Sequence, residues 1–167
     1  MGLNDIIKLV VSILACFAAA VIGSLFTFKA IPNWYAGLKK PPYTPPNWVF
    51  GPVWTTLYIL MGISVFLVWQ NGLATNGTLL AFTLFWIQLG LNALWSIIFF
   101  GMKSKGGGLI TIIVLWLFIL ATIITSFQVS TWAGALLIPY IIWVSIALYL
   151  NIGIWMLNKP GKQIASS

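Results

Sequence analysis

The sequence contains almost no charged residues. Of its 167 residues one is acidic, Asp5, none is histidine, and the eight basic residues are all lysine. Charged residues make up 5% of the chain, whereas a water-soluble domain contains about 25%. So few charges cannot cover the surface of a soluble domain. The composition therefore excludes a soluble enzyme, a nucleic-acid-binding protein and a disordered chain.

The chain also lacks the residues that most catalytic and metal sites use. Glutamate and histidine are absent, and no acid, lysine or histidine lies at the centre of a long apolar segment. A proton-coupled pump would therefore have no side chain to carry the proton, and a hydrolase would have no general base. The single cysteine, Cys16, excludes an intrachain disulfide and a multi-cysteine metal site. We therefore expect no metal site, no conventional catalytic site and no required cofactor.

Apolar sequence is what the chain has in abundance, because hydrophobic residues make up 61% of it. A membrane-crossing helix needs about 20 apolar residues. The uncharged segments 41–102 and 106–158 are each too long for one helix, and Asn-Gly pairs at 71–72 and 76–77 divide the first. The second is divided more weakly, near 130–134. We predict one all-α membrane domain over residues 1–167, a five-helix bundle with helices at about 7–28, 49–70, 78–101, 108–128 and 133–157.

The lysines are distributed unequally between the two sides of this predicted bundle. The side that holds the N-terminus and the loops near 71–77 and 129–132 carries only Lys8. The other seven lysines lie on the opposite side, in segments 29–48 and 102–107 and in the tail. Cytoplasmic loops of membrane proteins are enriched in lysine and arginine. We therefore expect the N-terminus outside and the C-terminus in the cytoplasm.

The loop at 29–48 has an unusual composition. Its five prolines prevent a helix over most of its length, and Asn47 is placed to cap the second helix. It also carries four aromatic residues, Trp34, Tyr35, Tyr43 and Trp48. A stiff spacer with interfacial aromatics is one interpretation. A lid over the cytoplasmic mouth of the bundle is the other, and we favour it because it explains the prolines and the aromatics together.

Polar and aromatic residues recur at helical spacing in three spans. In the third span Gln88, Asn92, Trp95 or Ser96, and Phe99 share one face. Either they form hydrogen bonds between helices or they line a cavity, and the spacing alone does not decide. The fifth span repeats Pro139, Trp143, Ala147 and Asn151, and the second places Trp54, Tyr58 and Met61 on one face. In the first span Ala15, Ala19 and Gly23 form a ridge of small residues that allows another helix to approach closely.

Three blocks of sequence resemble a known family. They are WYAGLKKPPYTPPNWVFGPVWTTLYILMG at 34–62, QLGLNALWSIIFFG at 88–101 and PYIIWVSIALYLN at 139–151. Their order and spacing are similar to those of the translocator protein family. This family is also called the tryptophan-rich sensory protein, TspO/MBR or peripheral-type benzodiazepine receptor family. Because the blocks span nearly the whole chain, the resemblance is more specific than a single short motif.

The resemblance implies a five-helix bundle, commonly a homodimer, with a pocket under the first loop. It implies binding of porphyrins such as protoporphyrin IX and of isoquinoline and benzodiazepine-type ligands, with a role in tetrapyrrole handling or stress sensing. In some bacterial members it implies, at most, porphyrin degradation that needs light and oxygen, for which Trp54 and Trp143 would be the reactive side chains. Lys39 and Lys40 would then attract porphyrin propionates at the pocket mouth. The ligand-binding positions carried over by motif are Tyr35, Trp54, Asn92, Trp95, Trp143, Ala147 and Leu150, and Gly23 on the first helix is added from outside the three blocks.

Two other functions remain open at this point. One is a passive transporter or channel for tetrapyrroles or other apolar metabolites, and the other is a regulatory scaffold that acts through protein contacts. The cholesterol motif of animal members is absent, because no basic residue follows Tyr149 until Lys159. The chain also shows no transit peptide, and we expect a bacterial cell membrane as its location.

The lysine asymmetry gives the first testable prediction. A reporter enzyme that is active only in the cytoplasm should be active when fused after Ser167 and inactive when fused before Met1, because the lysine-rich side stays inside. Reporter activity in cells measures this directly. Export of the C-terminal fusion would contradict the assigned orientation.

Overall fold

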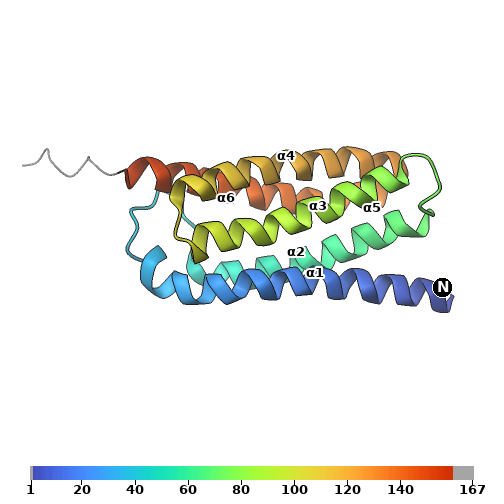
Figure 1. The fold of residues 1–167 in the computed structure, drawn as a ribbon, viewed down its shortest axis with the longest axis horizontal. Helices are drawn as coiled ribbons and strands as arrows, with labels where there is room; N and C mark the ends of the chain where they lie inside the picture. The colour runs from blue at the N-terminus through green and yellow to red at the C-terminus, as the bar shows by residue number, and fades with distance from the viewer. Residues whose placement is uncertain (1, 160–167) are drawn as a thin grey trace, which may run out of the picture.

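The computed structural model describes residues 2–159, and within this range the regular structure is helical. The helices run side by side along one long axis, so that α1 begins at one end of the molecule and α6 ends at the other (Figure 1). The elements are α1 (Leu3–Ala30), the π-helical turn η1 (Ile31–Tyr35), α2 (Asn47–Gln70), α3 (Thr78–Ser96), the π-helical turn η2 (Ile97–Gly101), α4 (Lys105–Val129), α5 (Thr131–Ala135) and α6 (Ile138–Leu157).

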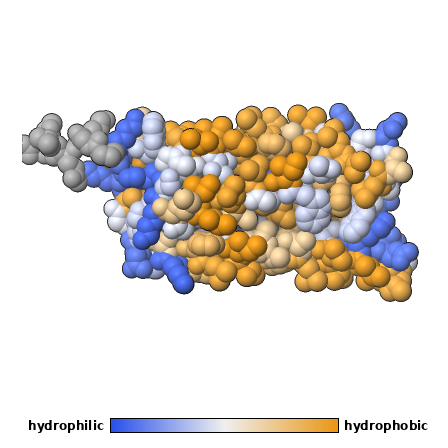
Figure 2. Space-filling model, in the orientation of Figure 1, coloured by the Kyte–Doolittle hydropathy of each residue, from blue (hydrophilic) through white to orange (hydrophobic). Residues whose placement is uncertain are grey.

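Five continuous helical stretches in the described residues are long and apolar enough to cross a membrane. They are Leu3–Tyr35, Asn47–Gln70, Thr78–Gly101, Lys105–Val129 and Thr131–Leu157. Figure 2 shows the matching surface, with apolar side chains around the middle and hydrophilic side chains at both ends. The predicted all-α, five-span membrane fold is confirmed. We call the end where residues 36–46, residues 102–104 and the end of α6 lie the lysine-rich end.

Two details at the helix ends differ from the sequence-based expectations. The first helix continues through Tyr35, although residues 29–35 were expected to belong to the loop. Pro32 lacks an N–H and its ring crowds the carbonyl of the residue four places earlier, and a wider π-helical turn accommodates this. Asn47 does not cap α2 either, since Pro46 occupies the N-cap position and Asn47 is already helical.

The fifth span is divided into α5 and α6 by residues 136–137. Pro139 explains the break, because its ring clashes with a helical carbonyl at position 135, where α5 ends. The loop before α5 is closed by Ser130, whose hydroxyl oxygen accepts a hydrogen bond from the backbone N–H of Ala133. This weak boundary, predicted near 130–134, is therefore a capped turn followed by a proline-induced break.

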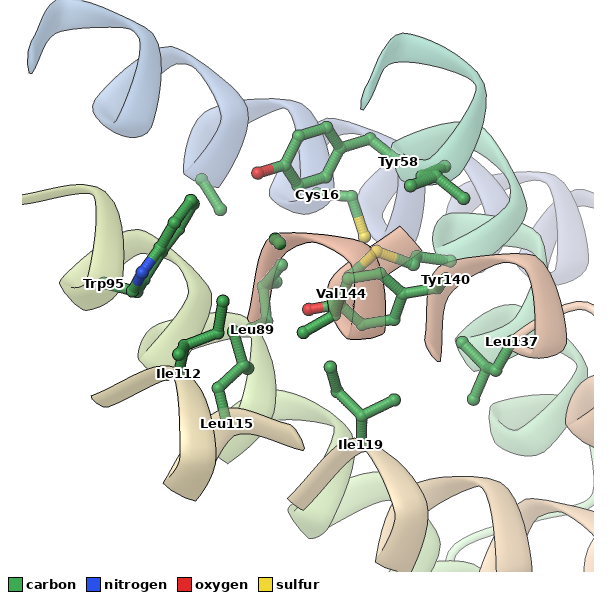
Figure 3. Close-up of a cluster of buried hydrophobic side chains, with 14 of the residues drawn as sticks. Cys16, Tyr58, Leu89, Trp95, Ile112, Leu115, Ile119, Leu137, Tyr140 and Val144 are labelled. Atoms are coloured by element: carbon green, nitrogen blue, oxygen red, sulfur yellow. The ribbon is translucent and has the colours of Figure 1, made fainter. Parts of the chain in front are cut away.

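The bundle packs α1 against α2 and α3, α3 against α4, and α4 against α6. Cys16, Met61, Val65, Phe85 and Tyr140 are among the fully buried residues of the shared core, part of which Figure 3 shows. The stretch that contains α1 is the least buried of the five. In its most apolar segment 22% of the residues are buried, against 39% to 44% in the other four stretches.

A close contact between α1 and α2 lies in the half of the bundle that holds the N-terminus. A Cβ atom added to Gly62 would lie 2.9 Å from the Cα of Ile13, which leaves no space for a side chain. Towards the lysine-rich end the predicted small-residue ridge is largely buried, with Ala19 and Gly23 inside and Ala15 half-buried. Small residues thus let α1 approach its neighbours at several levels.

This contact gives the second prediction. Gly62→Ala should lower the free energy of unfolding by about 1–3 kcal/mol, because the new methyl group forces the backbones of α1 and α2 apart. Gly90→Ala on α3 is the matched control, since nothing lies within 4 Å of a Cβ atom at Gly90. Thermal unfolding in one detergent compares the two variants. Equal stability would show that the backbones are not in contact.

Candidate ligand-binding site

A pocket of about 210 Å³ lies in the half of the bundle next to the lysine-rich end. Its walls come from the second half of α1, the first half of α2, and the end of α3 with η2. Within the described residues its lining contains no charged side chain. The lining residues are Phe17, Ala20, Gly23, Ser24, Thr27, Phe28, Ile31, Phe50, Gly51, Trp54, Thr55, Tyr58, Trp95, Ser96 and Phe100.

Two stacked aromatic pairs contribute to two walls of this pocket, one on α2 and one on α3 and η2. On α2, Trp54 stacks on Tyr58 with ring centroids 5.5 Å apart and an interplanar angle of 28°. On α3 and η2, Trp95 stacks on Phe99 with centroids 5.7 Å apart and an angle of 12°. Each pair holds its indole in a fixed orientation, since aromatic pairs add about 0.5–1.5 kcal/mol beyond the burial of their area. The pocket is therefore bordered by two oriented indole rings.

The inner wall is held by a hydrogen-bond network that joins three helices. The hydroxyl of Tyr58 on α2 donates to Oδ1 of Asn92 at 2.8 Å. Nδ2 of Asn92 on α3 donates to the hydroxyl of Tyr140 on α6 at 2.9 Å. All three side chains are buried, and Figure 3 shows Tyr58 and Tyr140 in the interior near Trp95. The network therefore fixes the position of Tyr58, which lines the pocket.

Three of the eight predicted binding residues, Gly23, Trp54 and Trp95, line the pocket together. Gly23 keeps α1 close to α3, because a Cβ atom there would lie 3.1 Å from Oγ of Ser96. Asn92 lies behind the pocket wall, in the network described above. Tyr35 is 4% exposed and packs edge-on against Phe99.

The remaining three, Trp143, Ala147 and Leu150, lie on α6. Ala147 and Leu150 are buried, and Nε1 of Trp95 donates to Oδ1 of the neighbouring Asn151 at 3.4 Å. Trp143 packs edge-on against Phe50, with ring centroids 5.6 Å apart. It lines a separate hollow between α2 and α6 together with Val53, Thr56, Leu57, Leu60, Pro139 and Ile142. The structure therefore separates Trp143 from the pocket that Trp54 lines.

The polar and aromatic face of the third span forms hydrogen bonds between helices and also lines the pocket. Asn92 forms hydrogen bonds between helices, whereas Trp95 and Ser96 line the pocket. Gln88, one turn before Asn92, is 1% exposed, and neither atom of its amide has a hydrogen-bond partner among residues 2–159. Residues on the same face of α3 therefore join helices at Asn92 and line the pocket one turn later.

The first loop is folded back onto the lysine-rich end rather than extended. The backbone N–H of Lys39 donates to Oδ1 of Asn158 at 3.0 Å, and Nδ2 of Asn158 donates to the carbonyl oxygen of Lys39 at 2.8 Å. The hydroxyl of Tyr149 donates to the carbonyl oxygen of Pro42 at 2.9 Å. The loop therefore lies against α6 and is not an extended spacer.

The aromatics and lysines of this loop divide into two groups. Trp34 and Tyr35 pack against Phe99, whereas Tyr43 is 95% and Trp48 76% exposed. The ammonium of Lys40 lies 4.7 Å from the centroid of the Tyr35 ring and donates to two loop carbonyls. Neither Lys39 nor Lys40 lines the pocket. Their attraction of porphyrin propionates therefore stays a prediction.

Comparison with known proteins places this architecture in a family. The family profile of TspO/MBR matches residues 12–156. This chain belongs to the TspO/MBR family. It is 46% identical to the tryptophan-rich protein TspO of Archaeoglobus fulgidus, over 92% of this chain and 99% of that protein. It is 42% identical to protein CrtK of Rhodobacter capsulatus, over 90% and 92%, and 40% identical to the translocator protein of Homo sapiens, over 90% and 89%.

The TspO/MBR resemblance is thus confirmed, and the chain is an integral membrane protein of this family. Several lining residues, including Phe17, Thr27, Phe50 and Thr55, were not predicted. Thr27 and Thr55 each donate to the carbonyl oxygen four residues earlier in their own helix, at 2.9 and 3.0 Å. A hydroxyl whose hydrogen bond is made within its own helix can face either lipid or a pocket. The positions of these threonines in the sequence therefore do not indicate that they line a pocket.

The network centred on Asn92 gives the third prediction. Asn92→Leu should cost about 1–3 kcal/mol of unfolding free energy, because it leaves two buried tyrosine hydroxyls without their partner. Tyr140→Phe should cost less, about 0.6 kcal/mol, which is the average for one hydrogen bond between membrane helices. Thermal unfolding ranks the variants, and Tyr43→Phe, at an exposed position, is the control. If Asn92→Leu is as stable as the control, the network does not hold the three helices.

Proposed function

We propose that this protein binds a flat, apolar ligand of the porphyrin class, such as protoporphyrin IX, in the pocket between α1, α2 and α3. The observation that supports this most is the pair of oriented indoles, Trp54 and Trp95, on two walls of one uncharged pocket. Aromatic faces bind flat conjugated ligands by stacking and by burial of apolar area. The resemblance of the three sequence blocks points to the same ligand class.

The size of the pocket sets a condition on this proposal. Its volume of about 210 Å³ is below the ~300–1,000 Å³ of most small-molecule sites. A whole tetrapyrrole therefore needs either an outward movement of α1 or a position in which part of the macrocycle protrudes. The low burial of the first membrane-crossing stretch favours the first possibility, although such a movement must separate α1 from α3 at the close contact between Gly23 and Ser96.

The proposed location and assembly follow from the sequence. We place the lysine-rich end in the cytoplasm of a bacterial cell on the lysine asymmetry, and we propose a homodimer on the family resemblance. We assign no metal or cofactor to the function. Among the described residues no three potential metal-ligating His, Cys, Asp or Glu side chains form a group.

The fourth prediction tests the ligand. Titration of the purified protein with protoporphyrin IX in the dark should quench tryptophan fluorescence to saturation, and Trp54→Phe should raise Kd about two- to tenfold through weaker stacking. Trp132→Phe is the matched control, because Trp132 is 73% exposed on α5, outside the pocket lining. Quenching that does not saturate, or equal Kd values for both variants, would argue against porphyrin binding in this pocket.

Trp143→Phe separates the two tryptophans that the resemblance associates with light chemistry. Because Trp143 lines a different hollow, its replacement should leave the dark Kd within about twofold. Under illumination an excited porphyrin forms reactive oxygen from O₂, and nearby indoles are then oxidised together with the ligand. We therefore expect Trp54→Phe to change the rate of porphyrin bleaching more than Trp143→Phe does.

Porphyrin flux into sealed proteoliposomes, measured with the same variants, would favour the alternative function of a porphyrin transporter.

A further inference from the structure

The pocket has its open side between α1 and α2. The lining residues exposed at the surface lie only on these two helices: Phe28, which is 76% exposed, Gly51 and Thr55. The lining residues from the other wall, Trp95, Ser96 and Phe100, are all buried. The mouth is therefore on the side of the bundle, at the seam between α1 and α2.

This mouth lies within the membrane-crossing segments. Gly51 and Thr55 come four and eight residues after Asn47, the first residue of α2, which places them about 6–12 Å along the helix at 1.5 Å per residue. Phe28 and Thr27 lie at the corresponding end of α1, and both helices belong to membrane-spanning stretches. The mouth therefore faces the lipid of one leaflet, close below the polar surface at the lysine-rich end.

The chemistry of the rim suits contact with lipid. Ser24, Thr27 and Thr55 each donate their hydroxyl to a carbonyl oxygen of their own helix, at 2.8, 2.9 and 3.0 Å. The donors of these groups are thus already satisfied, and the cost of placing them in hydrocarbon is low. An apolar molecule dissolved in the bilayer meets a rim that offers little resistance to its passage.

The first loop, by contrast, closes the lysine-rich end of the bundle. Its backbone is fastened through the two hydrogen bonds between Lys39 and Asn158. The Asn158 carbonyl oxygen in turn accepts from Nζ of Lys105 at 2.7 Å. Pro41 is buried against α6, where a Cβ atom at Gly153 would lie 2.5 Å from its ring. Residues 36–46 do not contribute to the pocket lining.

From these observations we propose that the pocket exchanges its ligand sideways with the lipid, through the seam between α1 and α2, while the first loop stays closed. The ligand class is then a molecule that partitions into the bilayer before it binds. This inference rests on the proposed function, because it needs a ligand that occupies the pocket. It assigns to Gly51 the role of keeping the mouth open, since a larger side chain there would project into the gap.

The experiment compares ligand exchange in variants whose mouth is narrowed with ligand exchange in a protein whose first loop is crosslinked to the end of α6. Gly51→Leu narrows the seam, and it should fold because nothing lies within 4 Å of a Cβ atom at Gly51. Gly90→Leu on α3 is the matched control, also exposed and with free space around its Cβ atom. The loop is locked by a short bismaleimide crosslink in the double variant Lys39→Cys/Asn158→Cys, while the native Cys16 is fully buried. Thr55→Leu provides a second rim variant.

Protoporphyrin IX is delivered from phosphatidylcholine vesicles to the protein in proteoliposomes, and stopped-flow tryptophan quenching gives the association and dissociation rates. Gly51→Leu should slow both association and dissociation about fivefold or more, because a barrier at the mouth acts on passage in both directions. Thr55→Leu should act in the same direction. The crosslinked loop and Gly90→Leu should leave both rates unchanged.

The outcomes separate this inference from the proposed function. If the crosslinked loop slows binding and the rim variants do not, the ligand passes under the loop and lateral exchange is wrong, although porphyrin binding stands. If Gly51→Leu raises Kd and dissociation but leaves association unchanged, Gly51 contacts the bound ligand and does not control the mouth, which also overturns the inference. If the unmodified protein shows no saturable quenching, both proposals fail.

Discussion

Hydrocarbon offers no hydrogen-bond partner, and most polar side chains of the protein find their partners within the bundle. Hydroxyl groups find a hydrogen-bond partner in their own helix, as Thr27, Thr55 and Thr122 do by donating to the carbonyl oxygen four residues earlier. The side-chain amide of Asn92 uses partners on other helices. Asn92 therefore binds tyrosines from two other helices, and this requirement brings α2, α3 and α6 together behind the pocket.

The positions of the five spans could be predicted because they depend on local properties. Charge, apolar length and turn residues are all visible in short stretches of sequence, and the predicted ranges agree with the observed helices to within a few residues in most cases. The continuation of the first helix through Tyr35 depends instead on a distant contact. Trp34 and Tyr35 pack on the rings of Phe99 and Phe100, and burial of these aromatics favours a helix where prolines predict a loop.

The site was harder to predict than the fold, because spacing identifies a helical face but not the depth or the neighbour of each residue. Asn92 and Trp95 share a face, yet one joins helices and the other lines the pocket. Trp54 and Trp143 both belong to family blocks, yet they line different hollows. Lys40 turned out to contact its own loop, and its sequence position carries no sign of that.

The close contact between Gly62 and Ile13 fixes the spacing of α1 and α2 about ten residues into α1. From Ile13 to Phe28 the helix extends about 22 Å, so a change of about 5° in its tilt moves Phe28 by about 2 Å. Tilt is the variable that membrane helices adjust when their apolar length and the bilayer thickness differ. A change in the tilt of α1 would therefore also change the width of the seam between α1 and α2.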